Sequence, residues 1–115
     1  MAAGLVYQNR DELSAMRFRD FVDKDKSIHP STSENGFIIL RSNNSNQIRT
    51  LRNRLIAEDI HFTDFTETMV TGTYVEQQEE FDKTSEQDLE YYGICFFMNK
   101  EASRELTKKF SLYIK

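Results

Sequence analysis

The sequence has few of the residues that cross-link small domains. Among its 115 residues there is one cysteine, Cys95, so no disulfide can form within the chain. The two histidines, His29 and His61, are far apart, and neither has a cysteine or second histidine at ligand spacing. A zinc or iron site needs about three or four ligands close together, so we expect no metal and no cofactor. A lone cysteine is also typical of the reducing cytoplasm.

Long apolar runs and an excess of basic residues are absent as well. No stretch approaches the ~18 consecutive apolar residues of a membrane helix, and residues 1–7 lack the basic start of a signal peptide. The 15 basic and 19 acidic residues give a net charge of −4, whereas nucleic-acid-binding domains are usually basic. We therefore expect a cytoplasmic protein with no membrane contact and only a weak case for RNA. Nine Phe and five Tyr exclude disorder and favour one domain over residues 1–115.

Apolar patterning predicts four strands. Alternation predicts strands over 16–22 and 60–65, with Phe18 and Asp20 on one side and Arg19 and Phe21 on the other. Continuous apolar runs predict strands covered on both faces over 36–41 (GFIILR) and 89–98 (LEYYGICFFM). Residues 23–35, with the only proline, read as a loop.

Helical spacing predicts helices between these strands. The clearest covers 45–59, capped by Asn44 or Ser45, and another covers 100–109, capped by Asn99. A third segment, within residues 66–88, has a less regular helical pattern. Residues 1–7 fit either a helix tail or a disordered end. Residues 111–115 fit a short strand or an extended tail. The side chains expected to face inward are Ile48, Leu51, Leu55 and Ile56 in the first helix, Ala102, Leu106 and Phe110 in the second, and Tyr74, Val75, Gln78 and Phe81 in the third segment. The fold class is therefore α/β, a small layered mixed sheet flanked by helices.

One segment combines a carboxylate with hydroxyl groups after a strand end. It begins at Asp64 and includes Thr68 among four threonines of the sequence DFTETMVTGT. Ligands of layered α/β folds gather at strand ends, where a carboxylate can orient a water. The alternative is a turn held by local side-chain hydrogen bonds.

Basic side chains precede this segment. Arg49 and Arg52 share one helix face, which fits either a solvated surface or a grip on phosphate. His61 fits either a structural histidine or an imidazole base near Asp64. Cys95, in the middle of a strand, is expected to be buried and inert. The acid-rich stretch 76–90 reads as solvated surface.

The order of several segments resembles one family. GFIILRSNNSNQIRTLRNRL from Gly36, DFTETM from Asp64, DLEYYGICFF from Asp88 and LTKKFSLY from Leu106 are together similar to the domain-of-unknown-function family numbered two thousand, from about Arg17 onward. The resemblance implies a fold like that of type-two peptidyl-tRNA hydrolases. Family members usually have a strand and a helix before a segment like MAAGL. The resemblance thus implies an N-terminally truncated domain, or a chain that completes its sheet by oligomerising through an unpaired edge.

The resemblance also suggests two functions. Type-two peptidyl-tRNA hydrolases use a Lys near the first helix, an Asp after a later strand and a Thr beyond it. Asp64 matches that Asp and Thr68 matches the spacing to a Thr, while the basic residue would fall before residue 1. We expect a non-catalytic binding or regulatory module. The alternative is a hydrolase of a peptidyl-tRNA-like ester or amide, in which Asp64 orients water and Arg49, Arg52 and His61 bind the ligand.

Overall fold

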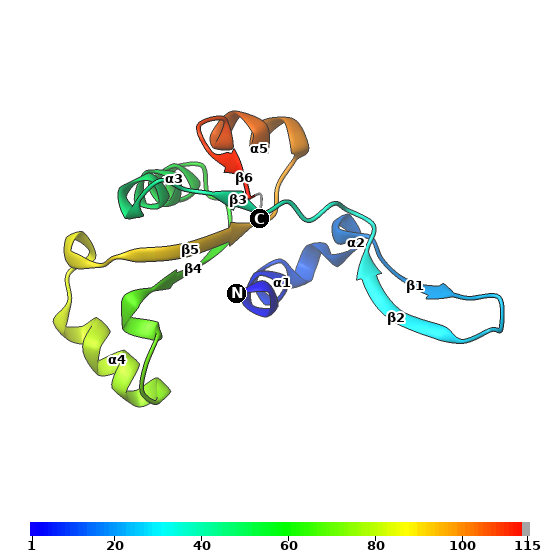
Figure 1. Ribbon diagram of the computed structural model, residues 1–115, viewed down its shortest axis with the longest axis horizontal. Helices are drawn as coiled ribbons and strands as arrows, with labels where there is room; N and C mark the ends of the chain where they lie inside the picture. The colour runs from blue at the N-terminus through cyan, green and yellow to red at the C-terminus, as the bar shows by residue number, and fades with distance from the viewer. Residues whose placement is uncertain (114–115) are drawn as a thin grey trace.

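The computed structural model describes residues 1–113 and confirms the α/β class, with helices placed between strands (Figure 1). The strands form three separate antiparallel ladders of two strands each. These are β1 (Phe18–Val22) with β2 (Ile28–Ser33), β3 (Leu40–Arg41) with β6 (Ser111–Leu112), and β4 (Phe62–Thr66) with β5 (Tyr91–Phe96). Among the described residues each strand therefore has one edge without a strand partner.

The helix α3 (Ser45–Ala57) provides most of the core and confirms the clearest helix prediction. The Asn44 side chain caps it by accepting a hydrogen bond from the Gln47 amide at 2.9 Å. Ile48, Leu51 and Leu55 are buried, as expected. Ile56 was wrongly placed inside, because it is 52% exposed. The buried stripe of α3 is therefore narrower than the apolar pattern suggested.

The β4–β5 ladder lies between α3 and α1 (Ala2–Gln8). Residues 1–7 are thus helical rather than disordered. The Gln8 side chain donates to the Phe62 carbonyl at 2.8 Å and to Thr63 Oγ1 at 3.0 Å. A Cβ added at Gly4 would lie 3.3 Å from Thr63 Oγ1, so the glycine permits this close approach. The strand prediction for 89–98 is confirmed over β5, although only Tyr91 in it is fully buried.

Two further helices follow the predicted positions. The helix α5 (Lys100–Thr107) is capped by Asn99, whose side chain accepts from the Glu101 amide at 2.9 Å. The helix α4 (Tyr74–Lys83) starts with a capping box between Thr73 and Glu76. Short helical turns complete the chain, namely η1 (Arg10–Glu12), α2 (Leu13–Met16), η2 (Glu67–Met69) and η3 (Glu86–Asp88).

Several inward-facing predictions for these helices are wrong. In α4, Tyr74, Val75 and Gln78 are exposed and only Phe81 is half-buried, while Ala102 of α5 is exposed. The main contacts of α4 are with η2 and those of α5 are with α3, rather than with a ladder, so helical spacing alone overestimated how much of each helix is covered. Of the two alternatives for residues 111–115, a short strand or an extended tail, the structure shows the short strand β6, and residues 114 and 115 lie outside the described ones.

The segment predicted as a loop over 23–35 contains the strand β2. Its proline misled the prediction, because Pro30 sits at a register shift of the β1–β2 hairpin, where a strand tolerates proline. The preceding strand begins later than expected, since Met16 lies in α2 and is buried.

The covered strand predicted over 36–41 is the largest error. Only Leu40 and Arg41 pair, and Phe37, Ile38 and Ile39 are 79%, 66% and 56% exposed. A continuous apolar run normally indicates burial on both faces, but no described layer covers these side chains.

The shape of the chain explains this exposure. Its extents are 54 × 35 × 34 Å and its radius of gyration is 16.7 Å, against about 13 Å for a compact domain of this length. The β1–β2 hairpin projects from the body (Figure 1). Within residues 1–113 no helix has the length and apolar character needed to span a bilayer.

Candidate functional site

Asp64 lies on the face of β4 covered by α3. Its carboxylate accepts a hydrogen bond from Arg52 Nε at 3.1 Å, and the two side chains are 22% and 24% exposed. The Arg52 guanidinium also lies 5.7 Å from the ring centres of both Phe62 and Tyr91. The predicted carboxylate and one predicted arginine thus meet, as a partly buried ion pair.

Arg49, one turn earlier in α3, holds the turn before β5. Its Nε donates to Glu86 Oε2 at 2.8 Å, and its Nη2 donates to the backbone carbonyls of Glu86 and Leu89. This guanidinium lies 5.1 Å from the centre of the Tyr91 ring, and its hydrogen bond lowers the pKa of the Glu86 carboxyl. Burial raises the pKa of the Tyr91 hydroxyl, which contacts Glu86 at 3.2 Å. Both predicted phosphate-binding arginines therefore have carboxylate partners within the chain.

Thr68 lies in η2 and has different neighbours from Asp64. Its hydroxyl is 2.7 Å from that of the buried Thr66. It also lines an acidic cleft of about 430 Å³ between η2 and α4. The other lining residues are Glu67, Thr71, Glu76, Glu79, Glu80 and Thr84. Asp64 and Thr68 therefore have different hydrogen-bond partners, and only Thr68 lines this cleft.

The two remaining residues from the sequence analysis are His61 and Cys95. His61 is exposed just before β4 and has no hydrogen bond to Asp64 among the described contacts. Cys95 is partly buried, and burial raises the pKa of its thiol, as expected for an unreactive cysteine. Across residues 1–113 no group of three or more Cys, His, Asp or Glu side chains is arranged to bind a metal ion.

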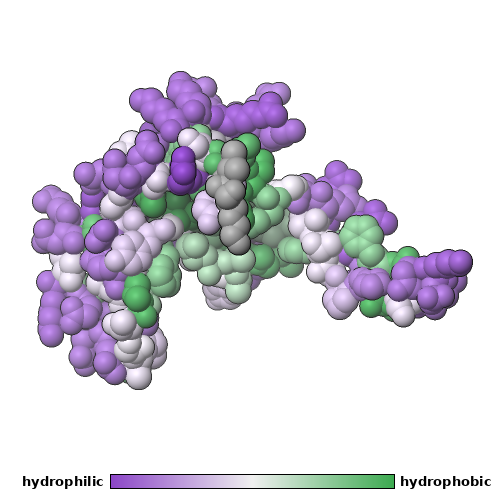
Figure 2. Space-filling model, viewed as in Figure 1, coloured by the Kyte–Doolittle hydropathy of each residue, from purple (hydrophilic) through white to green (hydrophobic). Residues whose placement is uncertain are grey.

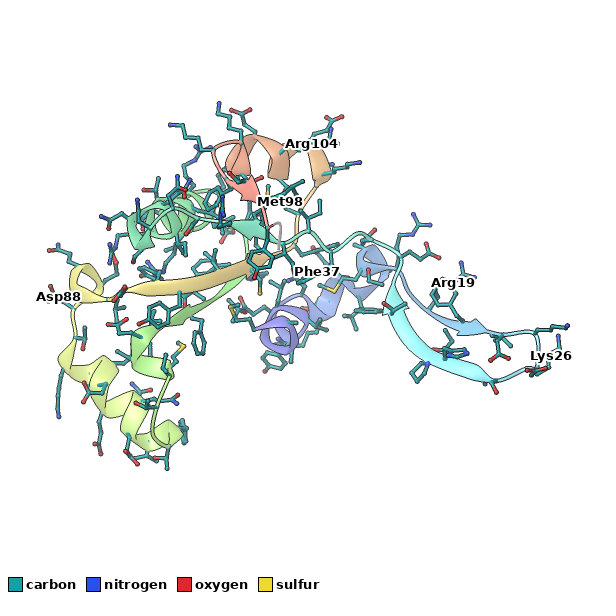
Figure 3. The ribbon with its side chains drawn as sticks, viewed as in Figure 1. Arg19, Lys26, Phe37, Asp88, Met98 and Arg104 are labelled. Atoms are coloured by element: carbon teal, nitrogen blue, oxygen red, sulfur yellow. The ribbon has the colours of Figure 1, made fainter. Side chains whose placement is uncertain are left out.

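A second, apolar groove was missed by the sequence analysis. It has a volume of about 260 Å³ and lies between the end of β4 and α4. Its lining residues are Phe65, Met69, Tyr74, Gln77, Gln78 and Phe81. The spacing of Tyr74 and Phe81 along α4 was the available signal, but it was interpreted as a core-facing stripe. Figure 3 shows Asp88 on the turn that leads from α4 into β5.

Comparison with known proteins supports the fold and the family. No curated protein matches the chain. A solved structure of a protein of unknown function, Atu0240 from Agrobacterium tumefaciens str. C58, matches with a TM-score of 0.77 and 16% identity. The match covers 98% of this chain and 81% of that one. A family described as protein of unknown function DUF2000 matches residues 1–114, a wider span than the resemblance from Arg17 onward. The chain therefore belongs to the DUF2000 family.

Proposed function

We propose that this protein is a non-catalytic binding module that holds an extended, apolar segment of a partner protein beside β4. The observation that carries the proposal is the apolar groove between Phe65 of β4 and the α4 side chains Tyr74 and Phe81. Among the described residues β4 has only β5 as a strand neighbour. The Gln8 side chain already donates to the Phe62 carbonyl at the start of β4, whereas the groove lies at the other end of the strand, beside Phe65. A strand edge without a strand partner next to an apolar groove is the arrangement used in β-strand addition.

The two parts of this surface would have separate roles. In an antiparallel ladder, alternate residues direct their N–H and C=O groups to the outer edge, so β4 can bond to the backbone of an added strand. The groove then binds one or two apolar side chains of the added strand. At about 260 Å³ it is smaller than the ~300–1,000 Å³ pockets that enclose small molecules, which favours side-chain capture over a free metabolite.

Charge defines the partner further. The cleft on the other side of η2 and α4 carries Glu67, Glu76, Glu79 and Glu80. Complementary charge increases the association rate and the specificity of protein complexes. We therefore propose that the apolar segment of the partner is flanked by lysine or arginine.

The contacts of the predicted catalytic residues favour binding over hydrolysis. A carboxylate that orients water must face the substrate, whereas Asp64 Oδ2 accepts a hydrogen bond from Arg52 and the side chain is only 22% exposed beneath α3. Thr68 faces an acidic cleft, which would repel the phosphates of a tRNA-like substrate. The hydrolase-like relationship and the alternative hydrolase activity stay predictions.

A peptide titration tests the proposal. We expect a peptide of alternating Val and Ile flanked by lysines to bind in calorimetry, and the same peptide flanked by glutamates to bind more weakly. Tyr74→Ser should weaken binding by roughly tenfold, because aromatic side chains dominate such contacts. The control is Tyr92→Ser, which alters an exposed tyrosine outside the groove.

Equal losses in the two variants, or no binding of either peptide, would contradict the module. The alternative is tested in parallel with a peptidyl-tRNA mimic. Cleavage by the wild type that disappears in Asp64→Asn would favour the hydrolase instead.

A further inference from the structure

The β1–β2 hairpin, here called the arm (residues 18–33), carries an apolar face that nothing in the described chain covers. Phe18, Val22 and Ile28 lie on this face and are 44%, 59% and 66% exposed, and Asp20 lies between the first two, where it accepts a hydrogen bond from Ser31. The opposite face carries Arg19 over the ring of Phe21, at 5.4 Å from its centre, and Phe21 is 51% exposed. Figure 2 shows separate hydrophobic patches among the hydrophilic side chains of the arm, away from the central body.

The arm is attached to the body only at its base. The Glu34 amide donates to the Arg17 carbonyl at 2.9 Å, and the Asn35 side chain donates to the Ala15 carbonyl at 3.0 Å. An isolated two-stranded hairpin is at best marginally stable in water. A hairpin that projects with these apolar side chains exposed therefore needs a further surface to pack on.

A suitable surface follows directly after the arm. Phe37, Ile38 and Ile39 form three consecutive exposed apolar residues that lead from the arm into β3. Figure 3 places Phe37 near the middle of the molecule and Lys26 at the tip of the arm. Because the connection between them is short and the arm points away, the arm does not cover this segment in its own chain.

The exposed area indicates how large the missing contact is. The chain exposes 8997 Å², whereas a folded monomer of this mass is expected to expose about 6,600 Å². The excess is roughly 2,400 Å² per chain. Obligate homodimers bury about 2,000–5,000 Å² in total, so two chains with this excess match the obligate class.

We propose that a second copy of this chain covers these surfaces. The arm of each copy packs Phe18, Val22 and Ile28 against residues 37–39 of the other copy. A two-fold axis satisfies both contacts at once, because each chain supplies one arm and one apolar segment. These residues are separate from the groove beside β4, so the dimer is independent of the proposed function.

Light scattering on the full chain after gel filtration tests the dimer. We expect the wild type to have twice the chain mass of 13.6 kDa at micromolar concentration. Val22→Lys and Phe37→Lys should each weaken the dimer at least tenfold and shift the mass toward the monomer. The matched control is Thr32→Lys, which adds the same charge to the opposite face of the arm, beside Arg19.

The outcomes are decisive in both directions. A wild-type monomer, or loss of the dimer in Thr32→Lys as readily as in Val22→Lys, overturns the proposal. A wild-type monomer whose arm amides become protected from hydrogen exchange only with the lysine-flanked peptide would assign the arm to that partner. If a lysine variant fails to fold, disulfide trapping decides instead. An Ile28→Cys chain mixed with an Ile38→Cys chain, both carrying Cys95→Ser, should cross-link faster than a Thr32→Cys and Ile38→Cys pair.

Discussion

Truncating Leu55 to alanine tests whether the small core under α3 holds the fold together. Leu55 is 0% exposed and is one of five buried apolar residues within residues 1–113. Removing a fully buried leucine side chain costs about 3 kcal/mol, from lost transfer free energy and from the cavity left behind. A domain of this size has a free energy of unfolding of about 5–15 kcal/mol, and so few buried residues favour the lower end. We therefore expect Leu55→Ala to remove about half of the stability and to lower Tm by roughly 10–20 °C.

Urea unfolding followed by circular dichroism measures this change, because the chain has no tryptophan to report on packing. The adjacent Ile56→Ala is the control, since that side chain is mostly exposed and should change stability by no more than about 0.5 kcal/mol. Both variants are compared at one protein concentration, because dimerisation would couple stability to concentration. Equal losses in the two variants, or a loss below about 1 kcal/mol in Leu55→Ala, would refute the assignment of the core.

Two further predictions concern the backbone and a surface carboxylate. Gly72→Ala should destabilise the chain by about 1 kcal/mol, because φ is +82° there and the new Cβ would lie 3.0 Å from Glu76 Oε2. The control is Gly36→Ala, which has open space around it and should have little effect in the same urea titration. The hydrogen bond from Arg19 lowers the pKa of Glu34 below its ordinary value of 4.5, so the stability that this pair provides is present above pH 4.5 and is lost as the pH falls through the lowered pKa. An NMR titration should show this pKa rising toward 4.5 in Arg19→Gln, and an unchanged pKa would contradict the pairing.

Local patterns predicted most helices and the central ladder correctly. The helix α3 has both a cap at Asn44 and an apolar stripe, and β5 has a run of apolar residues long enough for one strand. These signals are contained within the segment itself. Residues 36–41 have an equally strong apolar run. Whether these side chains are buried depends on which other segments pack against them, and the sequence of this one segment does not show that.

The candidate site was predicted in its residues but not in its contacts. Sequence spacing placed Arg49 and Arg52 on one face of α3, which is correct. Their partners Glu86 and Asp64 come from other elements, so the ion pairs depend on how β4 and η3 pack against α3. The groove beside β4 arises in the same way, from the packing of α4 rather than from its own periodicity.

The pairing of β3 with β6 has a consequence for how the chain is made. Leu40 pairs with Leu112, so this ladder joins segments that are far apart in the sequence. During synthesis the N-terminal part emerges first, and β3 has no strand partner until β6 has left the ribosome. The ladder then closes a long loop for only two residue pairs, which makes it a late and slow contact. Until then the apolar residues before β3 are exposed in the nascent chain. This is the longest period in which chaperones could bind them.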